Sequence, residues 1–192
     1  FGPNAEVDFF TDANPSRESY SVYAQTTYSL ADAFRIVSGL RYSEDTFTTD
    51  VTNFLNVESF QEEGTTDEIT SRVVAEVDFS EDLMGYFALA KGFKPGGSNL
   101  TFGFDDDNAP PMVFPTFEAE TVDSVEFGLK STFADGAARA NIAVFSYTYE
   151  NLQFQATDPD IYRGGVANIP ESEMSGLELS LIHISEPTRQ AE

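Results

Sequence analysis

The sequence predicts an all-β fold built from long antiparallel strands that follow one another as hairpins. Apolar and polar residues alternate with a period of two over unusually long segments, which is the pattern of strands with one apolar and one polar face. Very short turns also alternate with long polar loops along the chain. This layout is typical of the wall of an up-and-down transmembrane β-barrel, whereas a soluble β-sandwich has shorter strands and no such asymmetry between its ends.

The first predicted hairpin joins residues 19–30 to a strand that starts at Phe34. One face of this hairpin carries Tyr20, Val22, Ala24, Thr26, Tyr28 and Leu30 on its first strand and Phe34, Ile36, Leu40 and Tyr42 on its second. The opposite face of the second strand carries Arg35, Val37, Gly39 and Arg41. Residues 31–33 leave room for only a tight turn, so the two strands are predicted to pair as a hairpin.

The same unit recurs twice. Residues 69–79 and 83–94 form the second predicted hairpin, and residues 120–133 and 139–155 form the third. A seventh strand is predicted to begin near Val166 and to run through Leu179. The turns are then 31–33, 80–82 and 134–137, and the predicted loops are 50–67, 95–118 and 156–165. In 83–94 the two faces are too similar to assign.

Aromatic residues support a membrane span. Tyr20 and Tyr28 are eight residues apart on one face, as are Phe34 and Tyr42. At about 3.3 Å per residue this is roughly 26 Å of strand, or about 20 Å of height at the tilt of a barrel strand. Membrane barrels carry aromatic girdles around an apolar band of about this height.

Composition excludes several functions. A net charge of −23 argues against nucleic-acid binding, which needs a basic face. The chain has no Cys and one His, His183, so we expect no enzyme and no cofactor. Residues 105–108 could supply oxygen ligands to calcium, but they lack a known loop spacing, so a solvated loop tip is the simpler interpretation.

Four segments in order carry a family resemblance. SVYAQTTYSLADAFRIVSGLRYSEDTF, VVAEVDFSEDLMGYFALAKGFKPGGSN, ETVDSVEFGLKSTFADGAARANIAVFSYTYENLQ and the later GLEL resemble successive strands of TonB-dependent outer-membrane receptors. The resemblance implies an active transporter for a scarce nutrient such as a ferric siderophore, located in the outer membrane of a Gram-negative bacterium. A passive porin, a soluble β-sandwich binding module and an enzyme with a barrel wall remain alternatives.

The resemblance also implies how much of a receptor is present. A barrel of this family has about 22 strands, of which about seven are expected here as an open wall in residues 1–178. The expected partners are outer-membrane lipid, the remaining barrel strands, a plug domain, a small-molecule substrate, and the TonB complex, which is contacted through an N-terminal segment. We expect the plug and the N-terminal segment to lie outside this chain.

Two groups of residues are weak candidates for substrate contact. The first is the basic side chains predicted to face the lumen, Arg35 and Arg41, together with Arg72, Lys130 and Arg139. For each of these we expect pairing with nearby Glu76, Asp78 or Glu126. The second group is the loop aromatics Phe102, Phe104, Phe114 and Phe117, which could form an apolar ligand-contact patch or pack the loop down.

The last residues, 179–192, are predicted to be a non-native tail. LSLIHISEPTR back-translates to a sequence that resembles a transposase adapter used in DNA sequencing libraries. The receptor-like pattern also stops near Leu179, and His183 would then have no biological role. The alternative is a true last strand followed by a Pro-stopped terminus.

Overall fold

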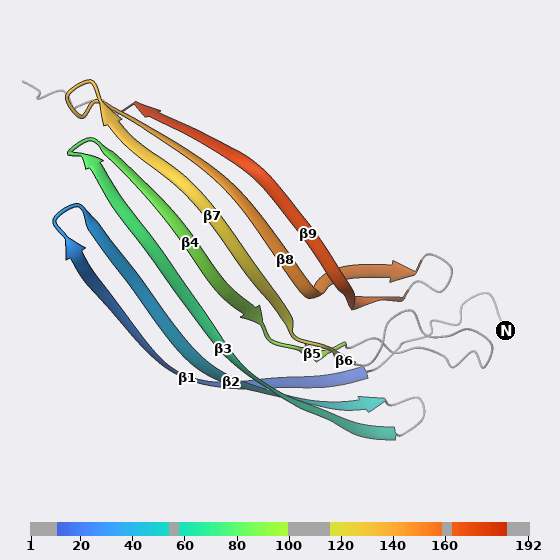
Figure 1. Cartoon of the computed structure of the whole chain (residues 1–192). Coiled ribbons are helices and arrows are strands. Elements are labelled where there is room, and N and C mark those ends of the chain that lie inside the picture. The colour runs from blue at the N-terminus through green and yellow to red at the C-terminus, as the bar shows by residue number, and fades with distance from the viewer. Residues whose placement is uncertain (1–10, 54–57, 100–115, 159–162, 184–192) are drawn as a thin grey trace, which may run out of the picture.

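The computed structural model describes residues 11–53, 58–99, 116–158 and 163–183. These form one seven-stranded antiparallel sheet in the order β1-β2-β3-β4-β7-β8-β9, and a two-stranded β5-β6 pair (Figure 1). The strands are β1 (Thr11–Ala31), β2 (Phe34–Asn53), β3 (Glu58–Ser80), β4 (Leu83–Lys94), β5 (Gly97–Ser98), β6 (Thr116–Phe117), β7 (Glu120–Phe133), β8 (Ala138–Asp158) and β9 (Arg163–His183). The all-β, antiparallel, open architecture and the seven strands of the sheet confirm the prediction.

The three tight turns lie together at one end of the sheet (Figure 1). They fall between β1 and β2, β3 and β4, and β7 and β8, as predicted. In the last turn, Ala134, Asp135 and Gly136 all have positive φ values of 55°, 54° and 89°. This left-handed backbone allows the chain to reverse within four residues, and the amide of Ala137 donates to the carbonyl of Ala134 at 3.0 Å.

Two predicted loops were wrong, because strands occupy most of them. β2 continues to Asn53 and β3 starts at Glu58, so most of 50–67 is paired; likewise β8 reaches Asp158 and β9 starts at Arg163. Polar cross-strand contacts hold the β2-β3 extension together, including Gln61 Nε2 donating to Asp50 Oδ1 at 2.7 Å. Apolar residues are few in this ribbon, so the regular alternation by which strands are detected is weak there.

We call the ribbon formed by residues 43–53 of β2 and residues 58–68 of β3 the outer extension. Its strands pair in register from Ser43 with Glu68 to Asn53 with Glu58. It is strongly acidic: its carboxylates include those of Asp50, Glu62, Glu63, Asp67 and Glu68. It therefore places a row of negative charge at the end of the sheet opposite the tight turns.

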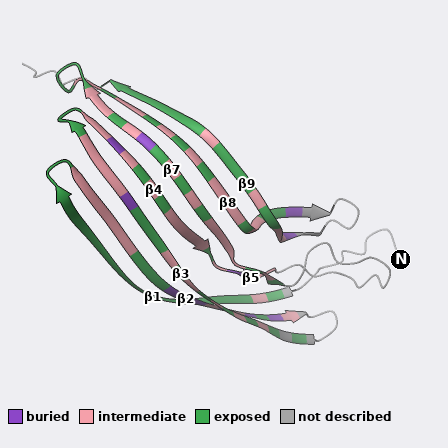
Figure 2. Cartoon of the chain, in the orientation of Figure 1, coloured by how far each residue is buried: buried purple, intermediate pink, exposed green. Residues whose placement is uncertain are grey.

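The sheet has one apolar and one polar face over its turn-proximal half. Cross-strand register places Tyr28 beside Ile36, Ala75 beside Phe87, and Phe127 beside Val144. This outer face is largely exposed (Figure 2). Its exposed apolar side chains are Tyr20, Val22, Tyr28, Leu30, Leu40, Tyr42, Ile69, Val73, Phe79, Phe87, Leu89, Val125, Phe127, Phe133, Ile142, Val144, Leu177, Leu179 and Leu181. The register also assigns the faces of β4, which the sequence left open.

The opposite, inner face carries Arg35, Arg41, Arg72, Glu126 and Lys130, in agreement with the alternation. An isolated sheet in water would bury its apolar face and expose its polar one. Here the apolar face is exposed instead, which is the arrangement that a lipid bilayer around a polar interior requires. In the described part of the chain, no helix is long and apolar enough to cross a membrane.

A small buried cluster lies on the inner face of the outer extension. Phe47 and Val51 are buried beside the polar Ser43, Asp45 and Thr49. The β5-β6 pair folds back over this part of β2, where Thr49 Oγ1 and Ser98 Oγ are 2.6 Å apart. The base of the 95–118 loop is therefore folded inward, over the polar face.

Aromatic rings fill the space above glycines on the inner face. A Cβ atom built on Gly128 would overlap the ring of Tyr86, and one on Gly176 would lie 2.7 Å from Cζ of Phe145. Tyr86 cannot swing away freely, because its hydroxyl donates to Glu126 Oε1 at 2.6 Å. Glycine at 128 is thus required by close approach rather than by backbone conformation.

Gly128→Ala is expected to lower the free energy of unfolding by about 1–2 kcal/mol, because the added methyl displaces the Tyr86 ring or breaks its hydrogen bond. Gly39→Ala is the matched control on the same face, since its Cβ would meet atoms only at 3.8 Å and beyond. Denaturant unfolding followed by far-ultraviolet circular dichroism is a suitable measurement, because the chain has no Trp. Equal effects of the two substitutions would contradict the packing argument.

Candidate functional site

Near the tight turns, the inner face carries Arg35, whose charge is neutralised by two carboxylates. Arg35 Nε contacts Glu76 Oε2 at 2.5 Å, and its Nη1 contacts Asp78 Oδ2 at 2.6 Å. The register places Arg35 directly opposite Glu76, so the sequence alternation on two hairpins brings the three groups together. Arg35 is paired as predicted, and two carboxylates on one guanidinium leave little capacity for a ligand.

A second polar group lies across β4 and β7. Tyr86 donates to Glu126, and Lys130 Nζ lies 5.1 Å from the centroid of the Tyr86 ring. Lys130 was expected to pair with an acidic side chain. Instead, its ammonium group contacts the ring of Tyr86, whose hydroxyl is hydrogen-bonded to Glu126. Phe145 and Tyr147 continue this layer on β8 with their rings stacked at 4.7 Å.

Arg41 differs from the prediction. Its guanidinium donates to Ser43 Oγ at 3.0 Å and to Ser21 Oγ at 2.8 Å, both hydroxyls. Within the described residues no carboxylate lies within ion-pair distance of Arg41, Arg72 or Arg139. The physical reason is register: the residue opposite Arg41 on β3 is Thr70, and the acidic Glu76 and Asp78 are closer to the turns.

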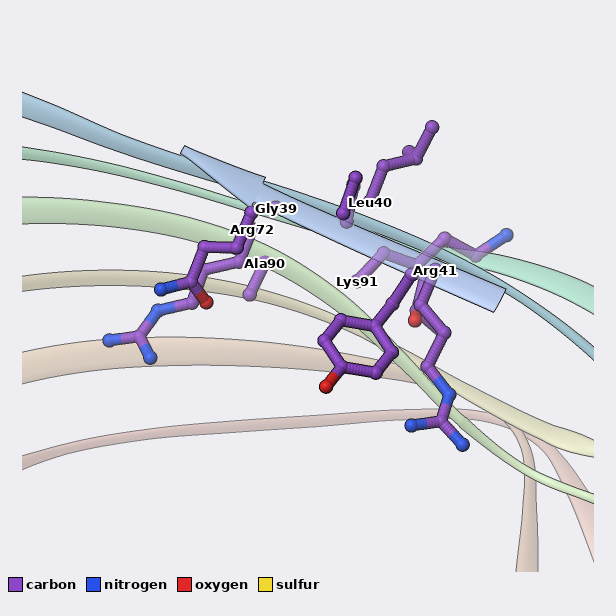
Figure 3. Close-up of a pocket in the computed structure, with 11 residues that line it drawn as sticks. Gly39, Leu40, Arg41, Arg72, Ala90 and Lys91 are labelled. Carbon is purple, nitrogen blue, oxygen red and sulfur yellow. The ribbon is translucent and has the colours of Figure 1, made fainter. Parts of the chain in front are cut away.

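Arg41 and Arg72 border the same shallow cavity, which has a volume of about 350 Å³. In Figure 3 both guanidinium groups extend from the same side of the sheet, whereas Leu40 extends from the other. The polar lining of this cavity also includes Tyr23, Gln25 and Lys91. A neighbouring cavity of about 390 Å³ shares Arg41, Thr70 and Lys91 with it. β3 and β4 stop pairing at Ser71 and Lys91, which opens this region.

Beyond the cavity, polar side chains fix the base of the 95–118 loop. Arg17 pairs with Asp45 at 3.1 Å and donates to the carbonyl of Gly96 at 2.7 Å. Asn99 exchanges two hydrogen bonds with the backbone of Val166, at 2.7 and 2.8 Å. Asn168 likewise bonds the amide and carbonyl of Glu118, at 2.8 and 3.1 Å. These amides replace backbone pairing where the strands separate.

Phe117 is the only one of the four predicted loop aromatics that the structure describes; Phe102, Phe104 and Phe114 lie outside the described residues. Its ring covers Gly97, where a Cβ would lie 2.7 Å from Cζ. Phe117 thus packs against Gly97 at the base of the loop. The predicted calcium candidate at 105–108 also lies outside the described residues. Among those that are described, no cluster of acidic or histidine side chains could hold a metal ion.

Sequence reasoning did not identify Tyr23 and Gln25 as site residues, or the amides of Asn99 and Asn168. Tyr23 and Gln25 lie opposite Arg41 and Gly39 on β2, but their association with Arg72 depends on the register of three strands. The amide contacts join residues 50 to 67 positions apart. No local pattern in the sequence reports them.

The fold and this face define a class: a membrane β-barrel wall with an apolar exterior, a polar interior and, at the end opposite the tight turns, a β5-β6 pair that folds inward. Residues 1–185 match the family model described as "TonB dependent receptor-like, beta-barrel". The chain therefore belongs to the TonB-dependent receptor β-barrel family, whose members are outer-membrane proteins of Gram-negative bacteria. This family comprises receptors and transporters rather than enzymes.

Individual relatives agree with this assignment. The chain is 29% identical over 171 residues to the pesticin receptors of Yersinia enterocolitica and Yersinia pestis, an alignment that covers 84% of this chain and 23% of the receptor. Among solved structures, it superposes on the ferric yersiniabactin uptake receptor FyuA from Yersinia pestis with a TM-score of 0.70 and 22% identity, covering 89% of this chain and 25% of FyuA.

The siderophore receptor PiuA from Acinetobacter baumannii gives a TM-score of 0.68 at 23% identity, covering 88% of this chain and 23% of PiuA. At these identities the superpositions establish the fold. The chain spans about a quarter of the length of the relatives that it matches.

Proposed function

We propose that this chain is a wall segment of an energy-coupled outer-membrane transporter that takes up a small metal chelate of the siderophore type. The observation that carries the proposal is the pairing of an apolar outer face and a polar inner face on seven strands that superpose on FyuA. The names of the relatives, which include a ferric yersiniabactin uptake receptor and a siderophore receptor, support the substrate class.

The proposed architecture has three parts. Residues 1–178 contribute seven strands to a barrel of about 22, other strands close it, and a plug domain coupled to TonB fills the lumen. The open edges of β1 and β9 are then paired by neighbouring strands, which removes a liability to aggregation. In this architecture, the 95–118 loop, with Phe102, Phe104 and Phe114, and the inner face around Arg41 are the parts of the chain that meet substrate.

We also propose that residues 179–192 derive from adapter sequence. Leu179–His183 pairs with β8, Ala138 opposite His183 and Ile142 opposite Leu179. An alternating apolar segment pairs with any open strand edge, so this pairing is compatible with a native or a foreign origin. Long-read sequencing of the source locus tests the proposal: a frame that continues past Glu178 into further alternating strands supports it, and a locus that encodes LIHISEPTRQAE followed by a stop rejects it.

The transport proposal is tested with the complete receptor from that locus, expressed in cells that lack their own ferric-siderophore receptors. Uptake of radioactive iron from a panel of ferric siderophores is expected, and it is expected to stop when the inner-membrane proton gradient is dissipated or TonB is deleted. Uptake that continues without TonB would indicate a passive porin instead. Binding to cells without any uptake would contradict the transport proposal.

A further inference from the structure

We propose that β3 carries a docking site for an extended, basic segment of another protein, which adds to the sheet there as a further strand. The site is the stretch of β3 over residues 58–70, on the side that faces away from β2, and we call it the free edge. This binding activity is separate from the proposed transport of a metal chelate. Three properties of the free edge carry the proposal: its missing strand neighbour, its charge and its position outside the membrane.

The missing neighbour is the first argument. β3 pairs with β2 from Glu58 to Val77, but with β4 only from Ser71 to Ser80. Figure 1 shows β3 continuing well past the end of β4. Within the described residues, no other strand pairs with the free edge. Every second residue of such an edge directs its amide and carbonyl away from the sheet, so the edge is a template for another strand.

Neighbouring groups leave the free edge accessible. β5 is paired with β6 in a separate sheet and packs on the inner face of β2, where Ser98 Oγ lies 2.6 Å from Thr49 Oγ1. Lys91 Nζ contacts Glu68 Oε2 at 3.3 Å, at the end of the free edge that is nearest to β4. Farther along the edge, the exposed residues are Gln61, Glu63, Thr65 and Asp67.

Charge is the second argument, and it defines the partner. Residues 42–71 contain no Lys, Arg or His. By register, Glu62 and Glu68 lie on the inner face of β3, and Glu63 and Asp67 lie on its outer face. A strand added at the free edge therefore meets carboxylates on both of its own faces. Opposite charges on neighbouring strands stabilise their pairing, so a basic strand fits this edge.

One pair of these carboxylates also repels in the protein without a partner. Asp67 lies directly opposite Glu44 on β2. Like charges directly opposite each other destabilise an antiparallel pair. Among the described residues, no Lys or Arg lies within ion-pair distance of either carboxylate. A cation on an added strand would lie beside Asp67 and reduce this repulsion.

The same charges disfavour the other occupants of such an edge. A second copy of the chain would bring one acidic edge against another, and charged side chains on an edge protect it from self-pairing. The remaining segments of the chain before residue 184, which are 1–10, 54–57, 100–115 and 159–162, contain no Lys, Arg or His. A basic segment of another protein fits both the edge and its charge. Strand addition of this kind takes its affinity from backbone hydrogen bonds and its specificity from alternate side chains.

Position is the third argument. In outer-membrane barrels the tight turns face the periplasm, and the opposite ends of the strands lie outside the cell. The free edge lies at the end opposite the tight turns. Beyond Ile69, which is exposed on the outer face, every residue of β3 that shares this face is polar. The free edge is therefore beyond the lipid and within reach of a protein in the medium.

The test is binding of a fluorescein-labelled peptide, TKKTVKKTV, to the complete receptor in detergent, measured by fluorescence anisotropy. The lysines of this peptide fall on both faces of a strand, to match the carboxylates of the free edge. TEETVEETV reverses the charge, and TKKTVKKTV with N-methylated backbone amides keeps the charge but has no amide donors. Saturable binding of the first peptide is expected, and the other two are each expected to bind at least about 10-fold more weakly.

Paired substitutions test whether the peptide binds at this edge. Glu62→Gln combined with Glu63→Gln removes one carboxylate from each face and is expected to weaken binding of TKKTVKKTV about 5-fold. Asp12→Asn combined with Glu18→Gln is the matched control, because it removes the same charge from the same end of the sheet, but on β1. β1 is two strand spacings, about 10 Å, from β3, which exceeds the screening length of about 8 Å. The control is expected to stay within about 2-fold of wild type.

Hydrogen exchange followed by mass spectrometry locates the bound peptide. In the receptor alone, about half of the amides of residues 58–70 point away from β2 and are expected to exchange fast. These amides are expected to slow when TKKTVKKTV binds, whereas exchange in β1 stays the same. Slow exchange of all amides of residues 58–70 without peptide would overturn the proposal, because the edge would already be paired in the complete receptor.

Three binding results would also overturn the proposal. They are the absence of binding of TKKTVKKTV to the wild type, equal binding of its N-methylated form, which would indicate charge attraction alone, and an equal loss in the β1 control. Iron uptake is measured separately, so the two proposals fail independently. A receptor that takes up iron with TonB but binds no peptide keeps the transport function and loses the docking site. A receptor that binds the peptide at the free edge but takes up no iron keeps the docking site and loses the transport function.

Discussion

Phe87→Arg is expected to destabilise the membrane-embedded barrel by about 2–4 kcal/mol, the cost of placing a cation on the lipid face near the bilayer midplane. Phe87 is on the outer face, 44% exposed, and lies opposite Ala75 and Phe127 on the two flanking strands. It is five residues beyond the turn at 81–82, about halfway across the apolar band. Its immediate neighbours on this face, Leu89, Ala75 and Phe127, offer no polar side chain to the guanidinium.

Tyr20→Arg provides the depth control for this substitution. Tyr20 is more exposed, at 68%, but it belongs to the aromatic girdle at the far boundary of the band. There the side chain can reach the headgroups, so the expected cost is only about 0–1 kcal/mol. Both values are obtained from denaturant unfolding of the complete receptor in lipid vesicles. If the two substitutions cost the same, the outer face does not contact lipid and the sheet is not a membrane wall.

Arg35→Gln is expected to cost about 2 kcal/mol of unfolding free energy, the second-largest effect that we predict. Removing the guanidinium leaves Glu76 and Asp78, which are two residues apart on the same face of β3, with no cation between them. Their side chains are 22% and 35% exposed, so water compensates only part of the loss. Arg35 also joins two hairpins next to the backbone bond from the Asp78 amide to the Ala33 carbonyl, at 2.8 Å.

The triple variant Arg35→Gln, Glu76→Gln, Asp78→Asn isolates the electrostatic part of this effect. It has side chains of similar size and no charge, so it is expected to recover most of the stability lost in the single variant. A triple variant as unstable as Arg35→Gln would show that the packing of the arginine, and not its charge, is what matters. A single variant with wild-type stability would show that the ion pairs contribute nothing measurable.

The sequence predicted the membrane-embedded half of this fold well, and its outer half poorly. Residues such as Phe34, Ile36 and Leu40 alternate with Arg35, Val37 and Arg41 because one face meets lipid and the other does not, and that asymmetry is written in the order of the residues. In the outer extension the apolar alternation is weak, because most of its residues are polar on both faces. Thr46 pairs with Thr65 and Gln61 with Asp50 there, so strand and polar loop have the same composition.

The candidate site was predictable only in part for a related reason. Alternation placed Arg35 and Arg41 on the same face, but it could not say that one has two carboxylate partners and the other has none. That difference depends on β3 register, which sets Glu76 opposite Arg35 and Thr70 opposite Arg41. The register is determined by the turn at 31–33 and by the length of the connection from β2 to β3. The sequence pattern predicts a loop over 50–67, whereas the structure has a much shorter connection between Asn53 and Glu58.

The acidic outer extension has a consequence for the kinetics of ligand arrival. The carboxylates of the β2-β3 ribbon lie at the end of the sheet opposite the tight turns, and their repulsion of an anion in solution extends about 8 Å at physiological salt. A neutral or cationic solute is therefore expected to reach this end of the sheet faster than an anion of the same size. Added salt is expected to reduce this difference in arrival rate.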